Sequence, residues 1–256
     1  MAESIRVATL VASTFGYGRE ILRGIYAYAR PSRRAWVFYG HDHSSATLEA
    51  LSNWQPQGIL VYASDPEHPR RLAPYRCPIV NVANVVDGVP WPTITLDHHA
   101  VGRMAADYFY ERGWRHLAYF GTSEHRYAQQ RQVGFTQALQ ERGLKAHVID
   151  DALLRQSAGL PASPGSVLRG LEASDTLFHT VAALPRPLGV LACNDIFASR
   201  LVETLVPRGV VVPDEVAVLG VDDDDLLCQR SYPPLSSVKV PAFQIGHEAA
   251  KLLDAL

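Results

Sequence analysis

Residues 188–225 read LGVLACNDIFASRLVETLVPRGVVVPDEVAVLGVDDDD, and this stretch decides the fold class. Residues 188–193 form an almost uninterrupted apolar run, which is typical of a strand buried on both faces of a parallel sheet. Asn194 can cap the helix that follows, and Pro207 ends it. A second buried strand, residues 216–220, runs into four consecutive aspartates. Ligands of open α/β sheets bind at the carboxyl ends of the strands, so these polar residues mark a candidate binding site.

The alternation of short strands and helices continues along the whole chain, which predicts doubly wound parallel sheets. The expected strands are residues 5–12, 35–39, 58–62, 78–82, 93–96, 116–120, 145–149, 188–193, 216–220 and 236–238. A first helix is expected to end near residue 29. Further helices are expected at residues 48–54, 97–113, 127–142, 168–183, 194–207 and 242–256. Residues 155–165 are expected to form a turn-rich loop.

These strands are too many for one sheet in a chain of this length, and the pattern restarts near residue 114. We therefore predict an α/β protein of two doubly wound parallel-sheet lobes with a cleft between them. The N-terminal lobe is expected to contain residues 1–113 and 240–256, because the last helix returns to it. The C-terminal lobe is expected to contain residues 114–239.

Composition narrows the class of protein. The chain has 256 residues, 47% of them hydrophobic, which is enough to bury a large core. Its formal charge of −2 gives no overall positive field that would attract nucleic acid. The three cysteines lie far apart in sequence, as expected of buried apolar residues in a reducing compartment. The N-terminal residues lack a basic, then apolar, leader, and no apolar run is long enough to cross a bilayer. We expect a cytoplasmic protein with no membrane partner.

Several blocks, in order, resemble LacI/GalR-type transcription regulators and their periplasmic sugar-binding relatives. They are residues 97–102 (DHHAVG), 113–121 (GWRHLAYFG), 131–143 (RQVGFTQALQERG), the opening stretch, and 233–250 (PPLSSVKVPAFQIGHEAA). Two shorter segments, 17–19 (YGR) and 127–131 (YAQQR), are similar to the xylose-operon regulator (XylR) group. Tyr127 and Gln130 stand where that group has tryptophan and glutamate.

This resemblance implies a periplasmic-binding-protein-like fold of type I, a sugar effector in the interlobe cleft, and a homodimer. A pentose such as xylose is the favoured effector, and no cofactor is expected. DNA would be bound only through a helix-turn-helix domain, which we expect to lie outside this chain. A sugar-binding protein of an ABC transporter is the alternative, although no signal peptide is visible. An enzyme of Rossmann or flavodoxin type is a third possibility, but no phosphate-binding loop or catalytic motif supports it.

Candidate ligand residues in the second lobe follow from both the residue chemistry and the resemblance. Sugar hydroxyls are donors and acceptors at once, so acids, amides and guanidinium groups suit them. Asp222 matches the family's sugar-binding aspartate, and Arg131 matches its effector-binding arginine. Asn194 can cap its helix and still face the ligand. Tyr127 either stacks on the sugar or packs against the protein.

The first lobe contributes weaker candidates. Tyr17 and Arg19 follow the first strand and match the XylR-like pattern. Asp65 and Asn84 follow the third and fourth strands, although an aspartate before proline is also typical of a turn.

Other polar residues are expected to serve structure or to lie in solvent. Asp195 suits the start of its helix, and Asp224 and Asp225 are expected to be solvated. Residues 41–43 (HDH) and 98–99 (HH) could suggest a metal, but no third ligand is identifiable. We therefore predict solvated histidines and no metal site.

Overall fold

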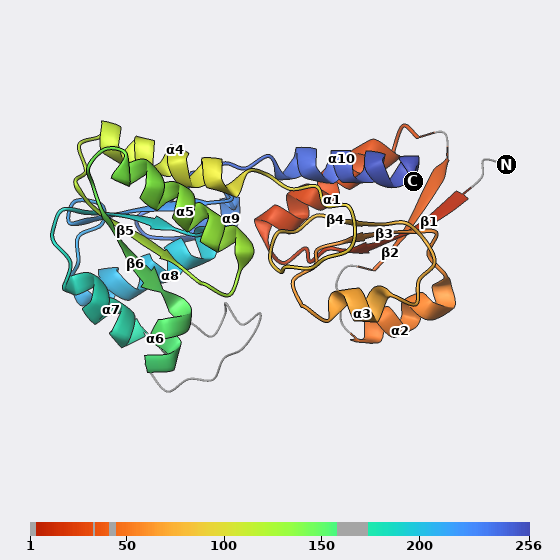
Figure 1. Cartoon of the computed structure of the whole chain (residues 1–256), viewed down its shortest axis with the longest axis horizontal. Coiled ribbons are helices and arrows are strands. Elements are labelled where there is room, and N and C mark those ends of the chain that lie inside the picture. Colours follow the sequence, from red (N-terminus) through yellow and green to blue (C-terminus); the bar gives the residue numbers. More distant parts are fainter. Residues whose placement is uncertain (1–3, 33, 41–44, 158–173) are drawn as a thin grey trace. The chain divides into compact units, whose positions relative to one another are not determined.

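The computed structural model describes residues 4–32, 34–40, 45–157 and 174–256 (Figure 1). Contacts divide the chain into two compact units, Met1–Leu96 with Pro241–Leu256 and Asp97–Val240, called here the first and second unit. Each unit is built on its own parallel sheet with helices, which confirms the predicted fold class. The expected boundary at residue 113 differs from this division. Helix α4 (His98–Glu111) belongs to the second unit, because it packs along α5 there.

The first unit has a four-stranded parallel sheet in the order β2-β1-β3-β4. The strands are β1 (Ser4–Leu10), β2 (Ala35–Tyr39), β3 (Gly58–Val61) and β4 (Ile79–Asn81). The helices are α1 (Gly16–Ala29), α2 (Ser45–Trp54), α3 (His68–Leu72) and α10 (Ala242–Ala255). The predicted strand 93–96 is wrong: only Thr93 forms a bridge, to Asn81. The preceding Pro92 has no N–H to donate to a sheet.

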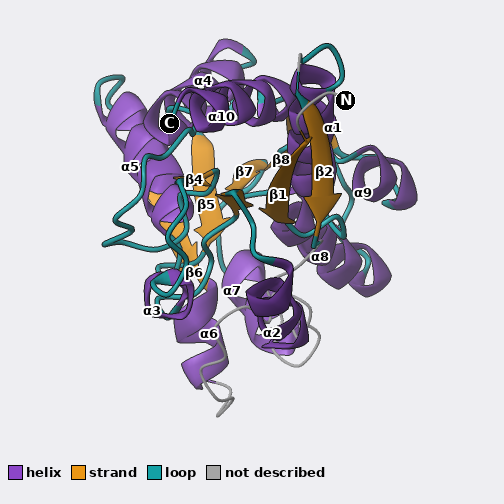
Figure 2. Ribbon diagram, turned by 90° about the vertical axis from the view of Figure 1, so that its right-hand side faces the viewer, coloured by secondary structure: helices purple, strands orange, loops and turns teal. Residues whose placement is uncertain are grey.

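Helices α1 and α10 lie side by side in this unit (Figure 2). Their backbones approach closely through two glycines. A Cβ atom on Gly24 would lie 2.0 Å from the carbonyl oxygen of Phe243, and one on Gly246 would lie 2.0 Å from that of Ile21. The last helix therefore fits the first unit only because both side chains are absent.

The second unit has a five-stranded parallel sheet in the order β6-β5-β7-β8-β9. The strands are β5 (His116–Gly121), β6 (Ala146–Asp150), β7 (Leu188–Ala192), β8 (Val216–Val221) and β9 (Ser236–Val238). The helices, besides α4, are α5 (Arg126–Gln140), α6 (Asp151–Ser157), α7 (Ser174–Ala182), α8 (Asp195–Leu205) and α9 (Asp225–Arg230).

Two expected segments of this unit fall partly outside the described residues. The loop expected at 155–165 begins inside α6, and its remainder from residue 158 is not described. Of the helix expected at 168–183, residues 168–173 are not described, and the described part forms α7.

The sheet order places the ends of β5, β7 and β8 side by side. All strands of the second sheet are parallel, so the segments that follow Gly121, Ala192 and Val221 share one edge of the sheet. Ala192 and Val221 lead directly into the Asn194 and Asp222 segments. The predicted ligand residues of this unit are thereby brought to a common edge. No helix within the described ranges is long and apolar enough to span a membrane.

Candidate functional site

Arg131 lies at the centre of a polar cluster in the second unit. Its side chain is only 2% exposed. The guanidinium donates from Nη1 to the carbonyl oxygen of Cys193 and from Nη2 to Oδ1 of Asp222, at 3.2 Å. Its Nε–H points to Nδ1 of His98, at 3.3 Å. The structure thus brings two of the predicted ligand residues, Arg131 and Asp222, into direct contact.

Close packing of α4 and α5 places Arg131 beside His98. A Cβ atom on Gly102 would lie 2.1 Å from the carbonyl oxygen of Arg131, and one on Gly134 would lie 2.0 Å from that of His99. The two helices therefore touch backbone to backbone at the level of the site. Because α4 begins at His98, this contact puts its first side chain next to the guanidinium.

The cluster retains hydrogen-bonding capacity for a ligand. A guanidinium carries five N–H donors, and three of those of Arg131 are used by the described residues. Two N–H groups remain, and Asp222 Oδ2 accepts no hydrogen bond from the described residues. The Asp222 side chain is 19% exposed, so a ligand can reach this carboxylate. The accessible acceptor of Asp222 therefore lies beside the unused donors of Arg131.

The backbone of Asp222 is held in an unusual conformation. Its φ is +114°, which L-residues rarely adopt, and its N–H donates to the carbonyl oxygen of Val238 at 3.0 Å. Strand β9 therefore anchors the residue that follows β8. Strained conformations persist where the surrounding structure determines them, and they are frequent at binding sites.

Burial and charge set the protonation states of the cluster. Burial lowers the pKa of the Arg131 guanidinium, but Asp222 together with Tyr127, Tyr119 and Cys193 leaves the pKa raised. Burial raises the pKa of Asp222, and the Arg131 charge opposes the rise. Burial and the Arg131 charge together lower the pKa of His98 to about 3. His98 is therefore neutral at neutral pH.

Asn194 and Tyr127 join the same cluster. Asn194 Oδ1 accepts from the N–H of Phe197 at 3.1 Å, which confirms the predicted helix cap. Its Nδ2 donates to the Tyr127 hydroxyl, also at 3.1 Å. The Arg131 guanidinium carbon lies 5.1 Å from the centre of the Tyr127 ring. Of the two interpretations of Tyr127, packing against the protein describes these contacts, and stacking on a sugar stays a prediction.

The remaining aspartates divide differently from expectation. Asp195 is structural, as predicted: it is 1% exposed and accepts from the hydroxyl of Ser237 at 2.6 Å and from the N–H of Asp224 at 2.7 Å. Burial raises the pKa of Asp195 to about 7. The prediction that Asp224 is solvated is wrong. It is buried and caps α9 by accepting from Leu226, whereas Asp225 is exposed as predicted.

Tyr17 and Arg19 lie near the start of α1, which follows β1 in the first unit. Arg19 donates from Nη1 to the carbonyl oxygens of Ser13 and Thr14, at 3.3 and 3.2 Å. The Tyr17 ring meets the edge of Tyr62, with centroids 6.2 Å apart. These contacts order the loop after β1.

Asp65 and Asn84 follow the neighbouring strands β3 and β4, so they share the carboxyl edge of the first sheet with Tyr17. Asp65 accepts from the N–H of Glu67 at 2.8 Å, the turn arrangement that its place before Pro66 also suggested. Asn84 is half-buried. A ligand role for the four first-unit residues stays a prediction.

His98 is the member of the cluster that the sequence reasoning missed. It was expected to be solvated, but it is 4% exposed. The sequence signal that could have found it is its place directly after Asp97, which caps α4. Among the described residues, no three His, Cys, Asp or Glu side chains form a group able to hold a metal. The segment 41–43 lies outside the described residues.

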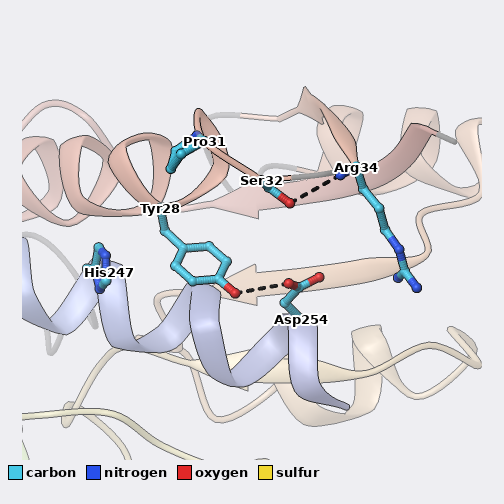
Figure 3. A pocket seen from close by; sticks show the side chains of 6 residues that line it. All are labelled: Tyr28, Pro31, Ser32, Arg34, His247 and Asp254. Atoms are coloured by element: carbon cyan, nitrogen blue, oxygen red, sulfur yellow. Dashed lines mark hydrogen bonds between the residues drawn. The ribbon is translucent and has the colours of Figure 1, made fainter. Parts of the chain in front are cut away.

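A separate pocket of about 560 Å³ lies in the first unit, between the end of α1 and α10 (Figure 3). Its lining consists of Tyr28, Pro31, Ser32, Arg34, His247 and Asp254. Two hydrogen bonds join lining residues: the Tyr28 hydroxyl donates to Asp254 at 2.9 Å, and the Arg34 N–H donates to Ser32 Oγ. None of the predicted ligand residues is among those that line it.

Comparison with known families identifies the domain. Residues 106–256 match the model of the periplasmic binding protein-like domain, which covers more than half of the chain. This chain belongs to that family. Residues 6–92 also match the XylR N-terminal domain. The family therefore agrees with the LacI/GalR-type, XylR-like resemblance, and the chain is an effector-binding domain of that type.

Two relatives and one solved structure show how this periplasmic binding protein-like domain is related to known proteins. It is 26% identical over 259 residues to the xylose operon regulatory protein of Escherichia coli (strain K12), covering 98% of this chain and 63% of the relative. It is 32% identical over 264 residues to the HTH-type transcriptional regulator GntR of Pseudomonas aeruginosa, covering 100% of this chain and 73% of the relative. A structure described as the xylose-binding transcription activator xylR superposes with a TM-score of 0.81 at 24% identity, covering 99% of this chain and 63% of that chain. The chain thus spans less than two thirds of the xylose regulators it matches.

Proposed function

We propose that this domain binds a neutral monosaccharide, with a pentose such as xylose as the favoured effector. In this proposal it belongs to a cytoplasmic, homodimeric transcription regulator, and the bound sugar changes DNA binding by an attached helix-turn-helix domain. The observation that carries the proposal is the contact of Arg131 with Asp222 at the carboxyl edge of the second sheet. The relative named as a xylose operon regulatory protein and the structure described as a xylose-binding transcription activator support the choice of sugar.

The chemistry of the cluster suits sugar hydroxyls. Asp222 Oδ2 can accept from a hydroxyl, and the two remaining N–H groups of Arg131 can donate to the same or a neighbouring hydroxyl. Charged partners give short, strong hydrogen bonds that fix the orientation of the ligand. Asn194 and Tyr127 add an amide and a phenol beside them. This combination matches a polyol better than an apolar ligand.

The charge balance favours an uncharged sugar. Arg131 carries one positive charge, Asp222 one negative charge, and His98 is neutral. A buried anion such as a sugar acid or sugar phosphate needs a net positive partner to offset its desolvation. We therefore expect a sugar to bind more tightly than the corresponding sugar acid.

The first unit is proposed to complete the site with Tyr17, Arg19, Asp65 and Asn84. In that arrangement the sugar binds in an interlobe cleft and favours the closed state. The free energy available for the change is the difference in the ligand's affinity for the two states. Because the matched relatives are named as regulators, regulation is favoured over transport or catalysis, and we propose that the domain is not an enzyme.

Isothermal titration calorimetry with a panel of pentoses, hexoses and D-xylonate tests the proposal. We expect D-xylose to bind, D-xylonate to bind more weakly, and Asp222→Ala or Arg131→Ala to weaken sugar binding by about tenfold or more. Asp225→Ala is the matched control, since this exposed aspartate three residues along should not affect affinity. The proposal fails if no sugar of the panel binds to the folded protein.

A further inference from the structure

We infer that His98 is a positioning residue, which accepts a hydrogen bond from Arg131 and thereby fixes the plane in which the guanidinium meets the effector. This inference rests on the proposed sugar site, but it concerns a residue outside the predicted ligand set. His98 adds a third hydrogen-bond acceptor for Arg131 to the two that the loops after β7 and β8 supply.

The geometry of the contact supports this role. His98 is the first residue of α4 and is 4% exposed. Its Nδ1 lies 3.3 Å from the Nε of Arg131, and its ring lies 5.9 Å from that of Tyr127, centroid to centroid, at an angle of 47°. Asp97 caps the helix by accepting from the N–H of Ala100, at 2.9 Å, which fixes the backbone that carries the imidazole. The ring is therefore held between the helix start and the site.

The acceptor role determines the tautomer of the imidazole. Nδ1 faces an N–H donor that is always protonated, so the proton of a neutral His98 must be on Nε2. The charged and titratable groups that face it are Arg131, Asp97 and Tyr127, with Asp222 beyond the guanidinium. Burial and the Arg131 charge outweigh Asp97 and keep the pKa of His98 at about 3. The acceptor therefore persists across the pH range in which the protein works.

Three acceptors from three elements hold the guanidinium. Cys193 and Asp222 lie on the loops after β7 and β8 and contact the two terminal nitrogens. His98 lies on α4 and contacts Nε, the third nitrogen of the planar group. Without the Nε contact, the guanidinium can rotate out of this plane while keeping its terminal contacts. The directions of its two remaining N–H groups would then no longer be fixed for the sugar.

Paired substitutions separate an acceptor role from a packing role. Asn places Oδ1 on Cγ, where histidine has Nδ1, so His98→Asn keeps an acceptor, whereas His98→Leu removes it. With D-xylose as the probe in calorimetry, we expect His98→Asn to bind within about threefold of wild type and His98→Leu to bind about tenfold more weakly. His99→Leu is the neighbouring control. His99 contacts Gln137 and not Arg131, so its loss should leave the affinity unchanged.

Nitrogen-15 NMR tests the contact without any ligand. We expect His98 to show the Nε2–H tautomer from about pH 5 to about pH 9, and the Arg131 Nε–H signal to exchange slowly in wild type and His98→Asn but not in His98→Leu. Titration of His98 near its ordinary pKa would overturn the inference, as would equal D-xylose affinity of wild type and His98→Leu. If no sugar binds but the Arg131 signal still requires an acceptor at position 98, the proposed function fails and the positioning of Arg131 stands.

Discussion

Replacement of Arg131 by lysine should destabilise the second unit although the positive charge is kept. Arg131 serves three acceptors on three elements, His98, Cys193 and Asp222. A single ammonium group occupies one place and cannot reach all three. If it stays with Asp222, the buried acceptors on His98 and Cys193 lose their donor. Each unpaired buried acceptor costs about 1–3 kcal/mol, so for two acceptors we expect a loss of roughly 2–6 kcal/mol in the free energy of unfolding.

Arg131→Met adds the loss of the charge itself. Breaking a fully buried ion pair costs about 3–5 kcal/mol, but Asp222 keeps 19% exposure, so the lower end of that range applies. The sign of the pH dependence distinguishes the two variants. Without Arg131, the pKa of Asp222 rises further, because burial is no longer opposed. The penalty in Arg131→Met should therefore shrink as the pH falls and Asp222 takes up a proton, whereas the penalty in Arg131→Lys should change little.

Urea denaturation followed by circular dichroism measures both penalties, and amide hydrogen exchange in β7 reports on the second unit alone. Arg103→Lys is the matched control. Arg103 also joins α4 to the end of α5, through two hydrogen bonds of 2.8 and 2.7 Å to Glu141. Because the Arg103 side chain is solvent-exposed, the urea midpoint of Arg103→Lys should equal that of wild type. An Arg131→Lys variant as stable as the Arg103→Lys control would refute the reasoning about the buried guanidinium.

Three further changes probe other parts of the fold. The folded pKa of Asp195, about 7, lies above its reference value of 3.8, so the stability it contributes is present below about pH 4 and lost as the pH rises towards 7. Urea denaturation between about pH 4 and pH 7 should show that the free energy of unfolding of wild type falls relative to that of Asp195→Asn. Parallel plots of this free energy against pH would contradict the expectation. Gly134→Ala would gain about 1 kcal/mol from helix propensity. Its Cβ would lie 2.0 Å from the His99 carbonyl oxygen, so we expect a net loss of about 1–3 kcal/mol; a variant more stable than wild type would show that the helices separate freely. Tyr28→Phe removes the hydrogen bond to Asp254 and should cost about 1 kcal/mol in thermal unfolding without changing sugar affinity, because Tyr28 lies at the opposite end of α1 from Tyr17.

Most of the fold could be predicted from the sequence, because buried parallel strands read as apolar runs between helical patterns. The failures arise where local pattern and tertiary contact differ. Residues 93–96 look like a strand but form a single bridge next to Pro92. Helix α4 was assigned to the first lobe because the pattern restarts after it, whereas its glycine contact with α5 places it in the second unit. The short helices α3, α6 and α9 were not predicted, since their few residues carry little periodicity.

The ligand residues could be predicted from the sequence where a segment that resembles the family also follows the end of a strand, as at Asn194 and Asp222. Arg131 and Asp222 were each predicted as ligand residues from the resemblance, and the structure brings them into contact. His98 and Asp224 were missed for a shared physical reason: each begins or caps a helix, where a polar residue is usually solvated. Their burial depends on tertiary neighbours that no local pattern encodes, namely α5 for His98 and Asp195 for Asp224.

The two glycine contacts have a mechanical consequence. The chain passes from one unit to the other before Asp97 and before Pro241, and in each case the next element is a helix, α4 or α10. Each of these helices is interlocked with a neighbour in its own unit through missing side chains, so neither can slide or roll without a steric clash. A displacement of α4 or α10 is therefore passed directly to the helix packed against it in the same unit.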